Sequence, residues 1–228
     1  MLDTHVIETG PNPRTTVIVL HGLGADGYDF VPICGELDLS AIGPVRYVFP
    51  HAPQRPVTIN NGYVMRAWYD ILVTDLVRRE DEAGLRESQR QIAELIDSER
   101  ARGVPANRIV VMGFSQGCAM TLMTALRYPE RLGGAIGMSG YLPLAATTAA
   151  ERSPANADLP IFLAHGTQDP IVVPPRGIAS RDALVALGYD VEWHDYPMPH
   201  SVCAEEIQHI NAWLLKQLVQ RVSESGGA

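Results

Sequence analysis

Short apolar runs rich in β-branched residues alternate along this chain with segments whose apolar residues have helical spacing. The runs span Thr16–Leu20, Arg46–Phe49, Ile109–Met112, Gly134–Met138, Ile161–Ala164 and Val191–Tyr196. The segments with helical spacing are Leu85–Arg102, Gln116–Tyr128, Ala179–Leu187 and Cys203–Val222. Near-continuous apolarity is typical of parallel strands covered on both faces. Because strands and helices alternate, we predict an α/β fold with a mostly parallel central sheet and helices on both faces.

The length and composition predict one domain, from residue 1 to residue 228. The chain is 46% hydrophobic and 19% charged, as in ordinary globular proteins, and no low-complexity stretch, repeat or linker divides it. The formal net charge of −8 disfavours binding to a phosphate backbone or to an anionic membrane. We therefore expect no nucleic-acid partner.

The first residues lack the basic start and apolar run of a secretory signal, and no stretch approaches the roughly 20 apolar residues that span a bilayer. We therefore expect a cytoplasmic protein without integral membrane association. The three cysteines, Cys34, Cys118 and Cys203, are too few and too widely spaced for a disulfide framework or a zinc site with paired ligands. They are interpreted as small buried apolar residues.

One connection does not fit the alternation of strands and helices. It runs from His51 to Gly84, about 34 residues, where about 2–6 are usual in such folds. It carries Trp68, Tyr69 and Leu72 among other apolar residues, and is too rich in them to be disordered. We expect this insertion of about residues 51–84 to pack at the sheet edge and form part of a pocket wall.

The sequence Gly-Phe-Ser-Gln-Gly at residues 113–117 matches the pattern G-x-S-x-G between a predicted strand and a predicted helix. In that setting a sharp, strained turn pushes the serine hydroxyl into a cleft at the end of the strand, and flanking glycines allow the chain to approach itself closely. The motif alone is also compatible with an ordinary turn between strand and helix. Its context favours Ser115 as a nucleophile of the α/β-hydrolase type.

A serine nucleophile needs a base, and the base needs a carboxylate to orient it; in α/β hydrolases these follow the serine in the order acid, histidine. Asp169 is the candidate acid because it follows the predicted strand Ile161–Ala164 in a turn, although it could also be a simple turn residue before a proline. Asp190, Glu192 and Asp195 lie in or beside the next strand and are interpreted as edge or solvent-facing residues.

The candidate base is His200, in the loop between the last strand and the last helix. Such a loop lies at the carboxyl edge of the sheet, where an imidazole can reach the nucleophile. His194 lies within a strand and His209 within a helix, so both are interpreted as surface or packing residues. We predict that His165, too close to the acid in the chain, and His21 are buried structural histidines.

The glycine-rich turn Leu20-His-Gly-Leu-Gly-Ala-Asp-Gly27 follows the first strong strand. Ester hydrolysis passes through a tetrahedral intermediate whose oxyanion needs main-chain donors. We predict these donors to be the N–H groups of Leu23, from this turn, and of Gln116, which follows the nucleophile. A plain turn is the alternative interpretation of the glycine cluster.

Five segments resemble the carboxylesterase and acyl-protein thioesterase family: LHGLGADG, APQRPVT with RAWYDI, GFSQGCAM, HGTQDPIV and PMPHSV. The resemblance runs from about residue 14 to residue 217. It implies a lidless α/β hydrolase with Ser115, Asp169 and His200 as the triad. It further implies that the segment around Met65, Trp68 and Leu72 lines an apolar groove for an acyl chain. Homodimers occur among such proteins.

These features predict a serine carboxylesterase that hydrolyses esters with short to medium acyl chains, without metal or cofactor. A first alternative is an acyl-protein thioesterase or lysophospholipase acting on long acyl chains, which would use the same triad. Eukaryotic thioesterase members carry a Pro-Ser-Trp-Phe type run where this sequence has Arg66-Ala-Trp-Tyr, which leaves the preferred length of the acyl chain open. A second alternative is a relative of dienelactone hydrolase, but that group carries cysteine at the nucleophile position, where this sequence has Ser115. The remaining alternative is an inactive hydrolase fold that serves as a binding module.

Overall fold

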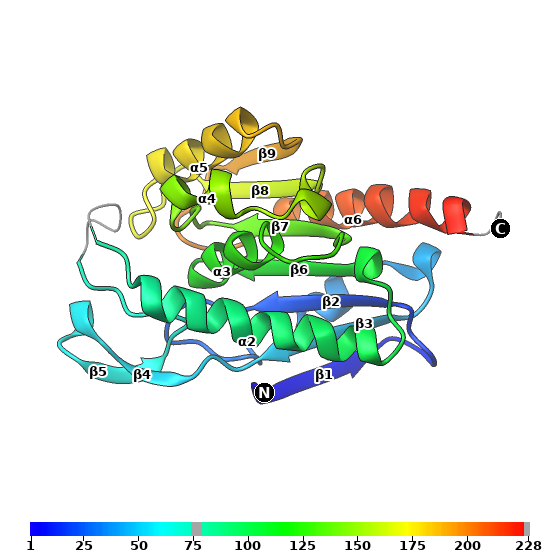
Figure 1. Ribbon diagram of the computed structural model, residues 1–228, viewed down its shortest axis with the longest axis horizontal. Helices are drawn as coiled ribbons and strands as arrows, with labels where there is room; N and C mark the ends of the chain where they lie inside the picture. Colours follow the sequence, from blue (N-terminus) through cyan, green and yellow to red (C-terminus); the bar gives the residue numbers. More distant parts are fainter. Residues whose placement is uncertain (74–78, 226–228) are drawn as a thin grey trace.

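A seven-stranded sheet forms the centre of the molecule (Figure 1). The structure is a computed structural model that describes residues 1–73 and 79–225, with side chains up to residue 219. The strand order is β1-β3-β2-β6-β7-β8-β9, and every neighbouring pair is parallel except β1 with β3. The strands are β1 (Thr4–Glu8), β2 (Thr15–Leu20), β3 (Val45–Pro50), β6 (Ile109–Phe114), β7 (Gly134–Met138), β8 (Ile161–Gly166) and β9 (Val191–Tyr196).

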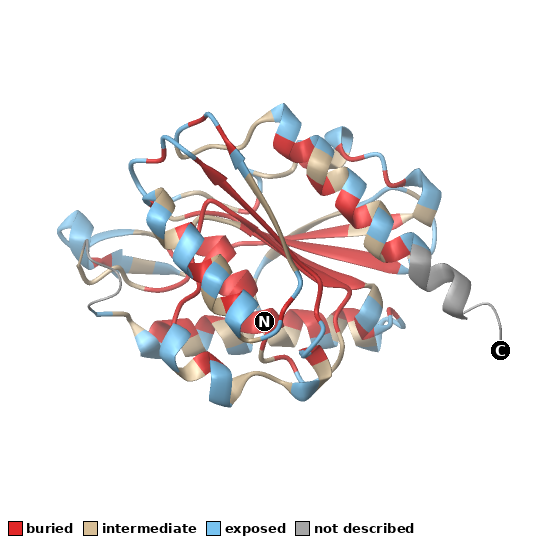
Figure 2. Ribbon diagram, turned by 90° about the horizontal axis from the view of Figure 1, so that it is seen from above, coloured by how far each residue is buried: buried red, intermediate tan, exposed pale blue. Residues whose placement is uncertain are grey.

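Helices cover both faces of this sheet, as the view from above shows (Figure 2). The helices of the described residues are α1 (Ile33–Glu36), α2 (Glu82–Ala101), α3 (Gln116–Ala125), α4 (Ala145–Glu151), α5 (Pro174–Ala186) and α6 (Ala204–Ser225). Apolar residues of α2, α3 and α5 belong to one buried cluster, and those of α1 and α6 belong to a second cluster. The predicted α/β fold with a mostly parallel sheet is confirmed.

Successive residues of the central strands alternate between the two clusters. Ile18 and Leu20 of β2 pack in the cluster with α2 and α3, whereas Val17 and Val19 pack in the cluster with α6. All four side chains are at most 1% exposed. Because both faces are covered, such a strand is apolar throughout, which is why its sequence shows no alternation with polar residues.

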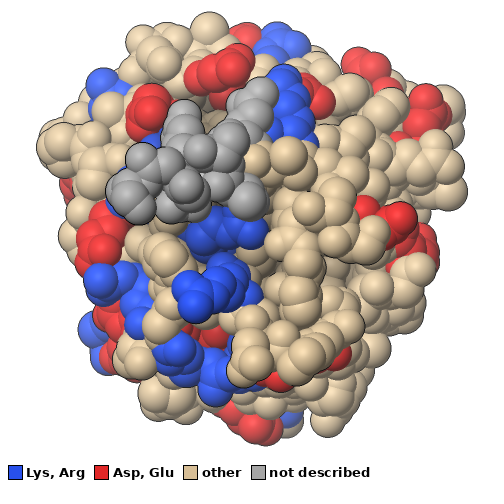
Figure 3. Space-filling view, turned by 90° about the vertical axis from the view of Figure 1, so that its right-hand side faces the viewer, with Lys and Arg blue, Asp and Glu red and all other residues tan. Residues whose placement is uncertain are grey.

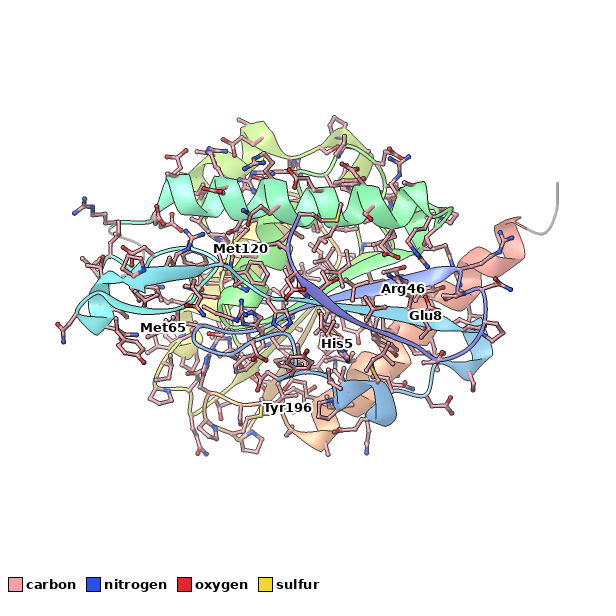
Figure 4. The ribbon with its side chains drawn as sticks, turned by 90° about the horizontal axis from the view of Figure 1, so that it is seen from below. His5, Glu8, Arg46, Met65, Met120 and Tyr196 are labelled. Carbon is pink, nitrogen blue, oxygen red and sulfur yellow. The ribbon has the colours of Figure 1, made fainter. Side chains whose placement is uncertain are left out.

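The antiparallel edge strand β1 was not among the predicted strands. Its side chains are partly exposed, and Glu8 near its end forms an ion pair of 2.6 Å with Arg46 of the neighbouring β3 (Figure 4). Arg46 also donates from Nε to Glu99 of α2 at 3.0 Å. An edge strand with one solvated side lacks the continuous apolar run that marked the central strands.

The connection from residue 51 to residue 84 contains a small antiparallel hairpin of β4 (Gln54–Val57) and β5 (Tyr63–Arg66). Between the two strands lies a 3-10 turn, Thr58–Asn60. The hairpin lies at the end of the molecule where the parallel strands of the main sheet finish (Figure 1). At the opposite end, where those strands begin, both basic and acidic side chains lie on the surface (Figure 3). The hairpin thus stands beside the carboxyl edge of the sheet, where α/β folds place their ligands.

Candidate active site

Ser115 occupies a strained turn between β6 and α3. Its backbone has φ 56° and ψ −116°, a left-handed φ that a residue with a Cβ rarely adopts. A Cβ on Gly113 would stand 2.2 Å from the Gly117 carbonyl oxygen, and one on Gly117 would stand 2.0 Å from the Leu20 carbonyl oxygen. The turn is held from the neighbouring strand, because the Ser115 N–H donates to the Met138 carbonyl at 2.9 Å. The two glycines are therefore required by the close approach of the chain to itself.

The Asp169 carboxylate is buried and fully engaged. Its Oδ1 accepts from the main-chain N–H groups of Ile171 at 2.8 Å and Val172 at 3.0 Å. Its Oδ2 accepts from Nδ1 of His200 at 2.6 Å, and the residue is 3% exposed. Three hydrogen-bond donors thus converge on the two carboxylate oxygens. The proton of the His200 ring is thereby assigned to Nδ1, so that Nε2 is left as an acceptor.

His200 lies in the loop between β9 and α6, and its ring centroid stands 4.7 Å from that of Phe114, the residue before Ser115. His200 and Ser115 line one cavity. The structure thus brings together two residues that are 85 positions apart in the sequence (200 minus 115). The loops that carry them meet because parallel strands end at the same edge of the sheet.

Two other histidines near the site have structural roles. His165 is 2% exposed and its Nε2 contacts the Val172 carbonyl at 2.7 Å. His21 is 1% exposed, with Nδ1 against the Gly22 carbonyl at 2.7 Å and Nε2 accepting from the Ala52 N–H at 3.0 Å. Burial lowers the pKa of His21, so its ring is neutral. Both positions agree with the prediction of buried structural histidines.

The two residues predicted to supply oxyanion donors line the same cavity as Ser115. Gln116 is the first residue of α3, so its N–H has no acceptor within the helix. Leu23 lies in the turn after β2, between Gly22 and Gly24. Gly22 packs against the strained turn at Ser115, because a Cβ added to Gly22 would be 3.4 Å from the Ser115 Cβ. Leu23, Ser115 and Gln116 all line the cavity.

The cavity has a volume of about 550 Å³ and a mostly apolar wall. Its apolar and aromatic lining comes from Leu23, Ala25, Ile59, Tyr69, Ile71, Phe114, Tyr141, Pro170, Ile171, Val172 and Val173. Asp29, Arg176, Ser115, Gln116 and His200 contribute the side chains that are polar. Tyr69 and Tyr141 share a hydrogen bond of 2.7 Å between their hydroxyl groups, and burial raises the pKa of both. An apolar chamber with a few convergent polar groups suits a small ligand with an acyl chain.

The three residues predicted to bind the acyl chain do not line this cavity. Trp68 is fully buried, and its Nε1 donates to the His21 carbonyl at 2.9 Å. Met65 lies on the hairpin (Figure 4), where its Sδ contacts Nδ2 of Asn60 at 3.5 Å. Leu72 is partly exposed and outside the lining.

The same connection instead contributes Ile59, Tyr69 and Ile71 to the wall. Outside helices, neighbouring side chains tend to point to opposite sides, as they do in a strand. That alternation was the signal that could have separated Tyr69 and Ile71 from Trp68 and Leu72.

The described part of the chain lacks two further features, a metal-binding cluster and a membrane-spanning helix. No group of three or more His, Cys, Asp or Glu side chains there is arranged to hold a metal ion. Within the same residues, no helix combines the length and the apolar character needed to cross a membrane.

The parallel sheet, the strained serine after β6 and the acid–histidine pair at its carboxyl edge define an α/β hydrolase. The sequence model of the phospholipase/carboxylesterase family matches residues 2–218, and the chain belongs to this family. The resemblance to carboxylesterases and acyl-protein thioesterases is thereby confirmed.

Curated relatives carry both activities in their names. An acyl-protein thioesterase 1 of Yarrowia lipolytica is 41% identical over 204 residues, covering 87% of this chain and 90% of the relative. The carboxylesterase SOBER1 of Arabidopsis thaliana is 34% identical over 208 residues, covering 90% and 91%.

Solved structures agree in fold over 90% or more of this chain. The crystal structure of Arabidopsis thaliana SOBER1 matches with a TM-score of 0.86 at 34% identity, covering 90% of this chain and 99% of that chain. The crystal structure of Zea mays acyl-protein thioesterase 2 matches with a TM-score of 0.84 at 31% identity, covering 96% and 100%.

Proposed function

We propose that this chain is a serine hydrolase that cleaves carboxylic esters through an acyl intermediate on Ser115. The observation that carries the proposal is the joint placement of Ser115 and His200 on one apolar cavity, with His200 hydrogen-bonded to the buried Asp169. Membership of the phospholipase/carboxylesterase family supports the same reaction class.

In the first half of the reaction, His200 Nε2 removes the Ser115 proton as Oγ attacks the ester carbonyl carbon. The carbonyl oxygen becomes an oxyanion, which the main-chain N–H groups of Leu23 and Gln116 stabilise. The C–O bond to the leaving group then breaks, and the imidazolium of His200 gives its proton to the leaving alcohol. Asp169 holds the ring in the required tautomer and stabilises its positive charge.

In the second half, water takes the place of the alcohol. His200 removes a proton from the water, the hydroxide attacks the acyl carbon, and the oxyanion forms again at the same two N–H groups. The Ser115 Oγ leaves and recovers its proton from His200. The acid product departs, and the enzyme returns to its starting state without a metal or cofactor taking part.

The acyl chain of the substrate occupies the apolar cavity, and short to medium chains are the proposed optimum. A second candidate substrate class is the thioester of an S-acylated protein, which the curated relatives named acyl-protein thioesterase 1 support. Both substrates place the same carbonyl above Ser115. Rates on an ester series from about four to sixteen carbons, compared with rates on an S-acylated peptide, separate the two.

The test of the nucleophile is Ser115→Ala. We expect it to abolish hydrolysis of a short p-nitrophenyl ester, because it removes the hydroxyl that forms the acyl intermediate, while the circular-dichroism spectrum stays that of the parent. A phosphonate reagent should label Ser115 alone. Unchanged turnover in the variant would exclude the assignment, and absence of burst-phase acylation in the parent would favour the inactive binding module.

The cytoplasmic location and the homodimer stay predictions from the sequence. Size-exclusion chromatography with light scattering measures the second of these directly.

A further inference from the structure

The side chain of Gln116 has no role in the proposed chemistry, yet it is 3% exposed and makes two hydrogen bonds. Its Oε1 accepts from the Trp68 N–H at 3.0 Å, and its Nε2 donates to the Tyr69 carbonyl at 2.9 Å. Gln116 therefore has two contacts. Its main-chain N–H is the proposed oxyanion donor, and its side chain binds the main chain of residues 68 and 69 in the pocket wall.

The other proposed donor is tied to the same wall segment. The indole Nε1 of Trp68 donates to the His21 carbonyl at 2.9 Å, two residues before Leu23. On the other side of Leu23, the Gly24 N–H donates to the Arg66 carbonyl at 2.9 Å. The turn that carries Leu23 is thus held on both sides by residues 66–68.

The wall segment is itself fixed to the body of the fold. The Ser88 hydroxyl of α2 donates to the Trp68 carbonyl, and both residues are fully buried. The indole also packs against the His21 ring, with 5.3 Å between the ring centroids. Buried hydrogen bonds of this kind fix geometry firmly because water cannot replace a lost partner.

We propose that the Gln116 carboxamide and the Trp68 indole are positioning groups that set the separation of the Leu23 and Gln116 N–H donors. The inference rests on the proposed function, because it assigns these groups to the oxyanion of that reaction. Donors must lie about 2.7–3.1 Å from the oxyanion to stabilise it, so a small displacement of one of them lowers the rate.

Gln116→Met tests the first group, because it keeps the length of the side chain and removes both hydrogen bonds. We expect kcat to fall about tenfold with KM changed less than about threefold, a smaller loss than the roughly 10²–10³ that follows removal of an oxyanion donor itself. Trp68→Phe removes the indole donor to the turn of Leu23, together with part of the ring that packs against His21, and we expect a loss of similar size. It also supplies the test where Gln116→Met does not fold.

The matched control is Ser88→Ala. It removes a buried hydrogen bond to the same Trp68 residue but leaves both contacts to the donor segments in place. We expect it to lower the urea midpoint as the other variants do, but with a smaller loss of kcat than either of them, because both contacts to the donor segments remain. A merely structural role for Gln116 and Trp68 predicts the same kcat change in all three variants.

A transition-state analogue provides a second readout. When a trifluoromethyl ketone binds, Ser115 Oγ adds to the ketone carbon, the hydroxyl proton passes to His200 and the former carbonyl oxygen becomes an oxyanion. We expect its inhibition constant to rise about tenfold in Gln116→Met and in Trp68→Phe. The inhibition constant of the corresponding alcohol, which forms no oxyanion, should stay within about twofold.

Two results overturn the inference. One is a folded Gln116→Met or Trp68→Phe variant whose kcat and ketone inhibition constant stay within about twofold of the parent. The other is an equal loss of kcat in Ser88→Ala. Turnover and Ser115 labelling of the parent report on the proposed function, whereas the ratios between variants and parent report on the positioning groups, so the two failures are distinguishable.

Discussion

Asp169→Asn is expected to disable the proposed base without disturbing the fold. In the parent, Oδ1 of Asp169 accepts from two main-chain N–H groups at 2.8 and 3.0 Å. An asparagine keeps these bonds only with its oxygen in the same place, which directs its NH2 group at Nδ1 of His200. A flipped amide would set its NH2 against two N–H donors and lose two hydrogen bonds, each worth about 1 kcal/mol.

The amide therefore donates to Nδ1 of His200, and the ring proton moves to Nε2. The histidine then faces Ser115 with a donor and cannot take its proton. Replacement of the triad aspartate by asparagine lowered kcat about 10⁴-fold in a serine protease, which corresponds to about 5.4 kcal/mol of lost transition-state stabilisation. We expect a loss of kcat in Asp169→Asn of the same order, with KM little changed.

The assay is hydrolysis of a short p-nitrophenyl ester at neutral pH, with the urea midpoint measured in parallel. Asp195→Asn is the matched control, because Asp195 is exposed on β9 and its substitution should leave kcat within about twofold. A kcat loss of less than tenfold in Asp169→Asn, with the fold intact, would refute the tautomer argument.

Two further predictions concern the strained turn at Ser115 and the ion pairs of Glu151. Gly117→Ala places a methyl group 2.0 Å from the Leu20 carbonyl oxygen, so the backbone must shift. We expect the free energy of unfolding to fall by about 2 kcal/mol or more and most of the turnover to be lost. Parent-like values for both would contradict the close approach. The pKa of Glu151 is about 2, below its ordinary 4.5, chiefly because Arg86 donates a hydrogen bond to its carboxylate. Partial burial opposes this by raising the pKa, and the hydrogen bond from Arg127 lowers it further by a smaller amount. Because the folded-state pKa is depressed, this contribution is full above about pH 4.5 and is lost as the pH falls toward 2. Because Glu151 is partly exposed, solvent screening weakens this contribution, and we expect Glu151→Gln to lower the free energy of unfolding by about 1 kcal/mol at pH 7. The difference, measured by urea titration, should shrink progressively below pH 4.5. A constant difference across that range would count against the ion pair.

The central strands were predictable because each is buried on both faces and so carries an unbroken apolar run. The predicted run at Ile109–Met112 lies within β6, and the pattern after it fixed the position of Ser115 from local sequence alone. β1 escaped prediction because its residues are partly exposed at a sheet edge. β4 escaped because Pro56 interrupts its pattern, and proline is tolerated in a strand only at edges and bulges.

The partnership of Asp169 with His200 could be inferred from chain order, because parallel strands deliver their following loops to one edge. The lining of the cavity could not be obtained in this way, since it depends on which side chains of an irregular segment turn inward. Trp68 shows the difference. An indole in a wall-forming segment suits an acyl groove by composition, yet its N–H reaches the His21 carbonyl and its ring is enclosed.

The length of the connection between residues 51 and 84 follows from the number of places it must reach. Its hairpin and the residues after it supply Ile59, Tyr69 and Ile71 to the cavity and contact α2 through Ser88. A connection of the usual length could run from β3 to α2. It could not also form a wall of the cavity and reach the two segments that carry Leu23 and Gln116. Tyr69 lines the cavity while its carbonyl accepts from the Gln116 side chain. In the proposed mechanism, the wall beside the acyl chain is therefore also the wall that positions the oxyanion donors. We therefore expect acyl-chain fit and catalytic rate to be coupled through one short stretch of main chain, so that a substrate which displaces this wall loses transition-state stabilisation as well as binding.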